Sequence, residues 1–215
     1  NMDLWTYRII NGNEISLSEM TGCGPLAGYD NNNIVNGQII GKVPQYIKID
    51  GNNEFYLVTD MNRTFYCCRS LTTAPAIPDS VTNMSGTFSR CSSLTTAPEI
   101  PNSVTNMSCT FEDCSSLKTA PEIPNSVTNM SSTFYGCSSL TTAPEIPNSV
   151  TDLWYTFCAC YKLEGIIVIN ANPTRYDEFF SGAATEGSGL KVTGSSNKLD
   201  ELIATGNSNC IKKGE

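Results

Sequence analysis

Apolar side chains return along the middle of the chain with a period of 23 residues. Leu71–Ser93 is followed without insertion by Leu94–Ser116, Leu117–Ser139 and Leu140–Lys162, and the second and third units agree at 19 of 23 positions. With the leucine counted as position 1, Leu, Ile, Val, Met and Phe recur at positions 1, 7, 11, 14 and 18. One such unit cannot bury its apolar residues alone, whereas stacked units form a continuous core. The pattern therefore predicts a solenoid with these five positions facing inward.

Phenylalanine extends this register beyond the four clear units. Six of the eight Phe residues fall at strict 23-residue spacing, and a Cys follows three residues later in the first five units, with Ala183 in the sixth place. The six are Phe65, Phe88, Phe111, Phe134, Phe157 and Phe180. We therefore predict a solenoid of six short coils over residues 58–185. Because the ends of a solenoid expose core and strand edges, we expect residues 1–57 and 186–215 to form caps.

The sixth coil indicates where the strands lie. It reads Gly165–Ile169, a β-branched run without proline, where the three preceding units read Thr-Ala-Pro-Glu-Ile. Positions 3–7 are therefore predicted strands, short and irregular in the other coils because each proline removes one hydrogen-bond donor. Positions 13–21 read Asn-Met-Ser-x-Thr-Phe-x-x-Cys, with Met and Phe four apart behind a capping Asn. This spacing predicts one or two helical turns, α or 3₁₀, on the opposite side.

Short elements are also predicted in the two caps. In the N-terminal one, Trp5–Ile10, Tyr46–Ile49 and Phe55–Val58 have the composition of strands, joined by turns such as Asn11-Gly12 and Asp50-Gly51.

In the C-terminal cap, Leu190–Thr193 is a predicted strand and Asn197–Thr205 a predicted amphipathic helix. The helix is expected to end before Gly206 and to turn Leu199, Leu202 and Ile203 inward.

Composition narrows the function. The chain has 13 Lys and Arg, 21 Asp and Glu and no His, a formal charge of -8. An acidic chain is unsuited to nucleic acid, and the missing His removes the commonest general base and metal ligand. Ser, Thr and Asn together make 67 of 215 residues, and no apolar run is long enough to cross a membrane. We expect an extracellular or cell-surface protein that is not an enzyme and has no metal, cofactor or transmembrane segment.

The segment 127–141, Val-Thr-Asn-Met-Ser-Ser-Thr-Phe-Tyr-Gly-Cys-Ser-Ser-Leu-Thr, resembles the bacterial leucine-rich repeats of the BspA-like surface-protein family. The resemblance extends over residues 58–185, with a proline at position 5 as the main difference. It implies a β-rich α/β solenoid, wound right-handed, on a secreted or surface-anchored bacterial protein of a type often proposed as an adhesin. Since the chain begins at Asn1, we expect that an export signal has been removed.

The cysteines of position 21 are predicted to be buried thiols. Five of them share position 21, so their Cβ vectors should run parallel along the stack, and a disulfide needs converging ones. They are Cys68, Cys91, Cys114, Cys137 and Cys160. The pairs Cys67-Cys68 and Cys158-Ala-Cys160 lack the spacing and the four ligands of a zinc site.

Two further sets of polar residues repeat with the coils. Four Asn residues match the glycosylation sequon but are expected to be copies of one structural capping residue: Asn62, Asn83, Asn106 and Asn129. Glu99, Glu122 and Glu145 share position 6. Stacked like charges repel, so this acidic ladder is expected to be solvated, with a weak cation site as the alternative.

The fourth unit breaks the repeat with aromatic residues. Trp154 and Tyr155 replace small residues, Tyr161 replaces a Ser, and Tyr135 lies one coil earlier. Exposed aromatic residues favour protein and carbohydrate contacts, which makes these four a candidate ligand-contact patch. The alternative is that they pack beneath the C-terminal cap. For the whole chain we expect adhesion to, or binding of, a host or bacterial surface protein or glycan. The alternative function is a structural spacer without a ligand.

Overall fold

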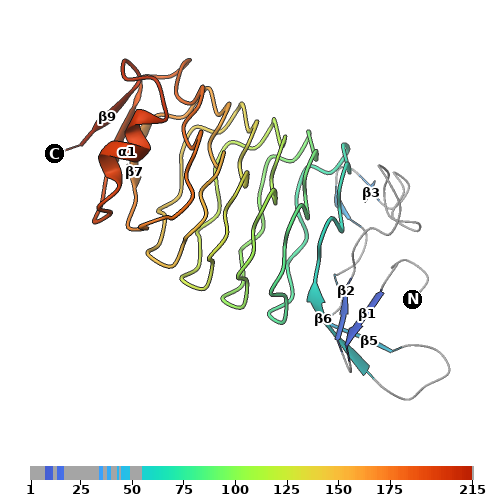
Figure 1. The fold of residues 1–215 in the computed structure, drawn as a ribbon. Coiled ribbons are helices and arrows are strands. Elements are labelled where there is room, and N and C mark those ends of the chain that lie inside the picture. Colours follow the sequence, from blue (N-terminus) through green and yellow to red (C-terminus); the bar gives the residue numbers. More distant parts are fainter. Residues whose placement is uncertain are drawn as a thin grey trace.

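The structure, a computed structural model, describes residues 8–11, 14–16, 34–35, 38–39, 43, 45–48 and 55–214. Successive coils stack side by side along one axis, with strands at the N-terminal end and a short helix at the C-terminal end (Figure 1). The two predicted N-terminal turns include residues outside the described ranges, so they remain predictions.

The N-terminal elements form two small sheets. β1 (Arg8–Asn11), β2 (Glu14–Ser16), β6 (Phe55–Asp60) and β5 (Tyr46–Lys48) lie side by side in that order, with β2 and β6 parallel and the other two pairs antiparallel. β3 (Ile34–Val35) and β4 (Gln38–Ile39) form a separate antiparallel pair. β6 leads directly into the solenoid, because its last residue, Asp60, bridges Asn83 of the next coil.

A column of phenylalanines runs through the core. All six Phe residues of the predicted register are fully buried. From Phe65 to Phe157 each ring stacks on the next, with centroids 5.3 to 5.7 Å apart and planes within 14° of parallel. Every Leu at position 1 and Val at position 11 is also buried, as are the residues at position 14 through Leu153. The predicted inward set is therefore confirmed, except that Ile123 at position 7 is only half-buried.

On the strand side, the extent of strand pairing depends on where prolines occur. β7 (Gly165–Val168) lies in the proline-free run of the sixth coil, as predicted. The proline-containing coils have only isolated parallel bridges on this side, at Thr73↔Thr96, Thr119↔Thr142 and Ile146↔Ile169. A proline cannot donate to the ladder, which explains why these coils pair at single points.

The helical turns predicted for positions 13–21 are wrong. Positions 15–20 are consecutive turns, and every residue at positions 16 and 20 has a positive φ, between +53° and +69°. Backbone N–H groups at alternate positions donate to the next coil, as Phe88 does to Thr110 (2.9 Å) and Arg90 to Glu112 (2.7 Å). Because a left-handed residue recurs at positions 16 and 20, the segment cannot continue as a helix, and every second N–H donates along the stack instead.

Polar side chains repeat with the coils and pair inside the stack. The buried Thr87 hydroxyl contacts the carbonyls of Met84 (2.7 Å) and Met61 (2.9 Å), and the later coils repeat the arrangement. The Asn83 side chain accepts a hydrogen bond from the backbone N–H of Ser85 (3.0 Å), as expected of a capping residue. Asn62 is not a copy of it, because Asp60 has that role in the first coil.

The C-terminal segment adds two strands and one helix. β8 (Leu190–Thr193) agrees with the predicted strand and pairs in parallel with β7 and with β9 (Ile211–Lys213), which was not predicted. α1 (Leu199–Ala204) is shorter than predicted, with Leu199 and Leu202 buried. Among the residues that the structure describes, no helix has the length and apolar character needed to cross a bilayer.

Candidate ligand-binding face

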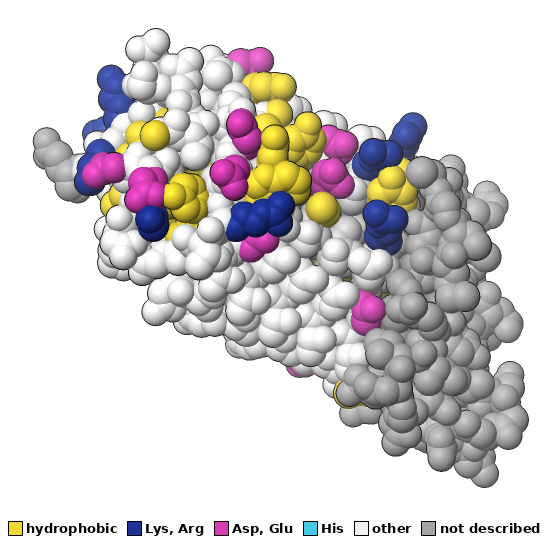
Figure 2. Space-filling model, in the orientation of Figure 1, with side chains coloured by type: hydrophobic (Ala, Val, Ile, Leu, Met, Phe, Trp, Pro, Cys, Tyr) yellow, Lys and Arg dark blue, Asp and Glu magenta, His cyan; other side chains and the backbone are white. Residues whose placement is uncertain are grey.

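The side chains that differ between coils gather on one side of the solenoid. They occupy positions 15, 16, 19 and 20, in the turn segments that flank the buried Phe column. We call the surface formed by these positions, from Asn62 to Gly182, the variable face. Figure 2 shows charged and apolar side chains in a band across the coils, on a surface made otherwise of uncharged polar groups.

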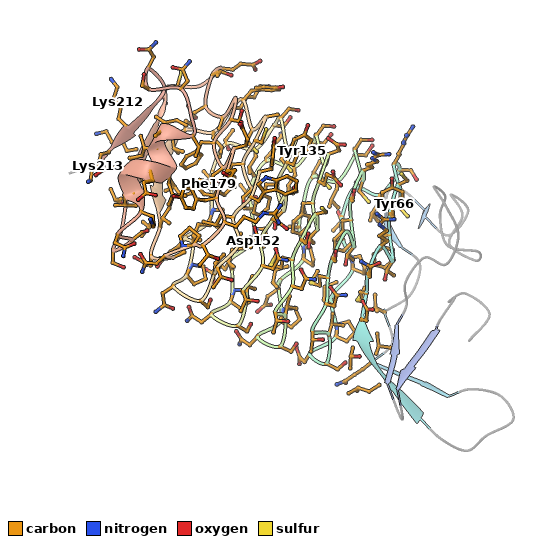
Figure 3. The ribbon with its side chains drawn as sticks, in the orientation of Figure 1. Tyr66, Tyr135, Asp152, Phe179, Lys212 and Lys213 are labelled. Carbon is orange, nitrogen blue, oxygen red and sulfur yellow. The ribbon has the colours of Figure 1, made fainter. Side chains whose placement is uncertain are left out.

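An aromatic cluster lies near the middle of this face. The Tyr135 and Tyr155 rings have centroids 6.2 Å apart, and the Trp154 and Tyr155 rings 4.6 Å apart, both edge to face. Figure 3 shows Tyr135 on the upper side of the coils, and Tyr66 on the same side near the N-terminal end. All three rings of the cluster are half-buried. Three of the four predicted patch residues are therefore brought together.

Tyr161, the fourth predicted residue, lies beside this cluster rather than within it. Its side chain is 40% exposed. A Cβ added to Gly182 would lie 3.6 Å from the Tyr161 ring, so this ring stands over the sixth coil.

Arg175 of the sixth coil contacts the Trp154 ring. The Arg175 guanidinium carbon lies 4.1 Å from the centre of the Trp154 ring. Arg175 also donates from Nη1 to Oδ2 of Asp152 at 3.3 Å, and Oδ1 of Asp152 accepts the Trp154 backbone N–H at 3.0 Å. The arginine therefore occupies one surface of the indole. Helix α1 meets the same coil elsewhere, with Glu201 hydrogen-bonded to Tyr176.

Charge is distributed unevenly along the variable face. At the N-terminal end, Tyr66 lies between Arg63 and Arg90, whose guanidinium carbons are 5.5 and 5.6 Å from its ring centre. One coil further on, Glu112 and Asp113 make the surface acidic. The nearby Cys158 sulfur, partial burial and these two carboxylates together raise the pKa of Tyr135.

The cysteines of position 21 lie beneath this face as thiols. Each Sγ from Cys91 onward donates to the Phe carbonyl of the preceding coil, at 3.0 to 3.1 Å. Burial raises the pKa of Cys91, Cys114 and Cys137 well above the usual value, so these thiols are neutral at pH 7. Within the described part of the chain, no cluster of His, Cys, Asp or Glu could hold a metal ion.

A groove on the strand side was not anticipated from the sequence. Positions 4–9 of the first three units line a cavity of about 720 Å³, and a second of about 480 Å³ continues it to Pro147. Ala, Pro and Ile side chains form its walls, together with Asp79, Glu99, Glu122 and Glu145. The predicted acidic ladder is thus exposed along this groove, and Glu145 accepts a hydrogen bond from the Asn170 amide at 2.6 Å.

Comparison with known proteins gives a family match and two similar folds. The model of the BspA type leucine rich repeat region matches residues 59–186 in six copies. A leucine-rich repeat protein from Bacteroides ovatus has 19% identity and a TM-score of 0.55, over 90% of this chain and 66% of that one. The leucine-rich repeat protein of T. pallidum has 19% identity and a TM-score of 0.58, over 95% of both chains. No curated protein matches the chain.

Proposed function

Because the chain belongs to the BspA-type leucine-rich-repeat family, we propose that it is a non-enzymatic, secreted or cell-surface protein that binds a protein or glycan partner through its variable face. BspA-type repeats are typical of bacterial surface proteins. The absence of His from the sequence supports a binding role over catalysis. The aromatic cluster of Tyr135, Trp154 and Tyr155, with Tyr161 beside it, is the proposed centre of contact.

The observation that carries this proposal is the choice of residues at positions 16 and 20. All twelve have a positive φ, yet only Gly86, Gly136 and Gly182 are glycine. A left-handed conformation costs about 1–2 kcal/mol for a residue with a Cβ, so stability alone favours Gly at every one. The other nine are Arg63, Cys67, Arg90, Cys109, Asp113, Ser132, Tyr155, Ala159 and Glu178. Side chains that the fold disfavours, and that differ from coil to coil, support a role in recognition.

A structural spacer is the second candidate. It is favoured by the near identity of the coils outside positions 15, 16, 19 and 20; the second and third units share 19 of 23 residues. A spacer needs stacking alone, however, and the differences at positions 16 and 20 then have no use.

Screening tests the proposal. Purified protein is applied to a glycan array and to a panel of host matrix and bacterial surface proteins. The variant Glu112→Ser/Tyr135→Ser gives both coils the position-19 Ser that Ser89 supplies in the first unit. The matched control Asn102→Ser/Asn125→Ser changes two exposed residues at position 9. We expect a ligand that wild type and control bind and the face variant loses. No ligand, or equal binding by the face variant, would support the spacer.

A further inference from the structure

Arginine already lies over aromatic rings at two places on the variable face. Arg175 lies over Trp154 at 4.1 Å, and Arg63 and Arg90 lie over Tyr66 at 5.5 and 5.6 Å. The planar guanidinium suits such rings because it stacks and hydrogen-bonds at the same time. The aromatic residues of this face therefore suit arginine, and arginines of the chain itself already lie over two of them, Tyr66 and Trp154.

Tyr135 and Tyr155 are a further aromatic pair on this face. The two rings contact each other, and Tyr155 also contacts Trp154. Within the described chain neither tyrosine ring has a Lys or Arg over it. Backbone hydrogen bonds bring acidic residues of the adjoining coils beside them: Asp113 N–H donates to the Tyr135 carbonyl (2.7 Å), and Tyr155 N–H to the Asp177 carbonyl (3.0 Å). The two rings thus lie between coils that carry acidic residues on this face.

Most of these acidic residues form no ion pair within the described chain. The flanking residues are Glu112, Asp113, Asp177 and Glu178. Among the ion pairs of the described residues, only Asp113 of the four takes part, with Arg90 at 3.8 Å. Glu112 forms no ion pair with the described residues; it accepts a hydrogen bond from the Ser89 hydroxyl at 2.9 Å and interacts electrostatically with Arg90. Two tyrosine rings on a surface where carboxylates outnumber their cationic partners attract a cation.

We propose that this acidic–aromatic patch (Glu112, Asp113, Tyr135, Tyr155, Asp177 and Glu178) binds arginine side chains of an exposed segment of a partner protein. The inference rests on the proposed function and names the chemistry of its partner. Arginine is favoured over lysine because its fork pairs with a carboxylate while its plane stacks on a ring.

The spacing of the coils fits an extended segment laid along the stack. Successive Phe rings beneath the face are 5.3 to 5.7 Å apart. Alternate side chains of an extended chain lie about 6.6 Å apart on one side. The two repeats differ by about 1 Å per coil, which the long arginine side chain can take up, so a segment with arginine at alternate positions can offer one guanidinium to each successive coil.

The test is a fluorescence anisotropy titration of the whole chain with the labelled peptide Arg-Ser-Arg-Ser-Arg and its lysine counterpart. Two variants alter the patch: Tyr135→Ser/Tyr155→Ser, and Glu112→Gln/Asp113→Asn. The control Glu99→Gln/Glu122→Gln also removes two negative charges, but from the groove on the strand side. Melting temperatures establish that each variant is folded.

We expect both patch variants to bind the arginine peptide at least ten-fold more weakly than wild type, and the control to bind it within two-fold of wild type. The wild-type protein is expected to bind the lysine peptide several-fold more weakly than the arginine peptide. Equal losses in patch and control variants, equal affinity for lysine, or no binding of the arginine peptide would overturn the inference. So would a dimer that the patch variants dissociate, because the patch would then hold a second copy. If the arginine peptide fails while a ligand from the screen still depends on the variable face, the proposed function stands without this inference.

Discussion

Arg175 stands over Trp154 at 4.1 Å and binds Asp152 at 3.3 Å, so that a cation bridges two successive coils. At the same repeat position, Asn83, Asn106 and Asn129 are stacked through parallel bridges, and the ladder continues through Asp152 to Arg175. The last step of this ladder is therefore an ion pair instead of an amide pair. The bridge holds the indole against the coil next to it.

The first prediction concerns this bridge. Trp154→Ala and Arg175→Ala are each expected to destabilise modestly, with a coupling energy of about 0.5–1 kcal/mol in a double-mutant cycle, because the arginine is exposed. Chemical denaturation of the four proteins measures it. A much larger loss for Trp154→Ala alone would mean that the indole packs beneath the C-terminal segment and has no role in binding.

The Phe column should dominate stability. Phe111 is fully buried, and its ring lies 5.7 Å from those of both Phe88 and Phe134. Phe111→Ala is expected to cost about 3–5 kcal/mol because it leaves a cavity inside the stack. Thermal melting followed by circular dichroism checks this, with the exposed Tyr161→Ala as control. An unchanged melting temperature for Phe111→Ala would be incompatible with the stacked core.

Left-handed positions give opposite effects for reciprocal substitutions. Ala159 has a φ of +59°, so Ala159→Gly is expected to raise stability by about 1 kcal/mol through relief of strain. Gly136→Ala should lower it, because a Cβ there would lie 2.4 Å from Oδ1 of Asp113. Denaturant midpoints of the two variants measure the difference, and a destabilised Ala159→Gly would contradict the backbone assignment.

The buried thiols predict a loss of stability in alkali. Burial raises the pKa of Cys91, Cys114 and Cys137 in the folded chain, whereas unfolded thiols titrate near pH 8.5. The unfolded chain therefore releases these protons first, and each thiol's stabilising contribution, complete below about pH 8.5, declines above it by about 1.4 kcal/mol per pH unit. Unfolding free energies between pH 7 and 10 test this. Cys114→Ala should decline less steeply than wild type; parallel curves would refute the assignment.

The core could be predicted from the sequence because the same residue type occupies the same buried position in every coil. Phe at position 18 and Leu at position 1 repeat without exception from Phe65 to Phe180 and from Leu71 to Leu163, and the structure buries them all. β7 was predictable for the opposite reason, since the sixth coil lacks the prolines that interrupt the ladder elsewhere.

The turn segments were harder because φ is not visible in most side chains. Gly86, Gly136 and Gly182 indicate a left-handed backbone at positions 16 and 20. The other nine residues at these positions are not glycine, so their residue types do not predict a positive φ. The Met–Phe spacing then favoured a helix that does not form. The Arg175 contact joins residues 21 apart in the chain, which become neighbours only when the coils are placed in register.

The groove at positions 4–9 was missed for a related reason. Its prolines were recognised as breaks in the ladder, but their effect on the space between coils depends on how the stack relaxes around them. Three of the four aromatic residues of the predicted patch, Tyr135, Trp154 and Tyr155, lie together, and a role in binding remains a prediction. The acidic residues of the adjoining coils, Glu112 and Glu178, became evident as neighbours only from the stacking.

The central claim is that residues of the variable face serve recognition and the fold does not need them. Trp154→Ser/Tyr155→Ser tests it most directly, because Ser131 and Ser132 occupy these two positions one coil earlier, so the variant makes the repeat more regular. Its melting temperature and its dissociation constant for a ligand from the screen are measured together. We predict a melting temperature within a few degrees of wild type and at least ten-fold weaker binding. A sharply lowered melting temperature with unchanged affinity would contradict the account.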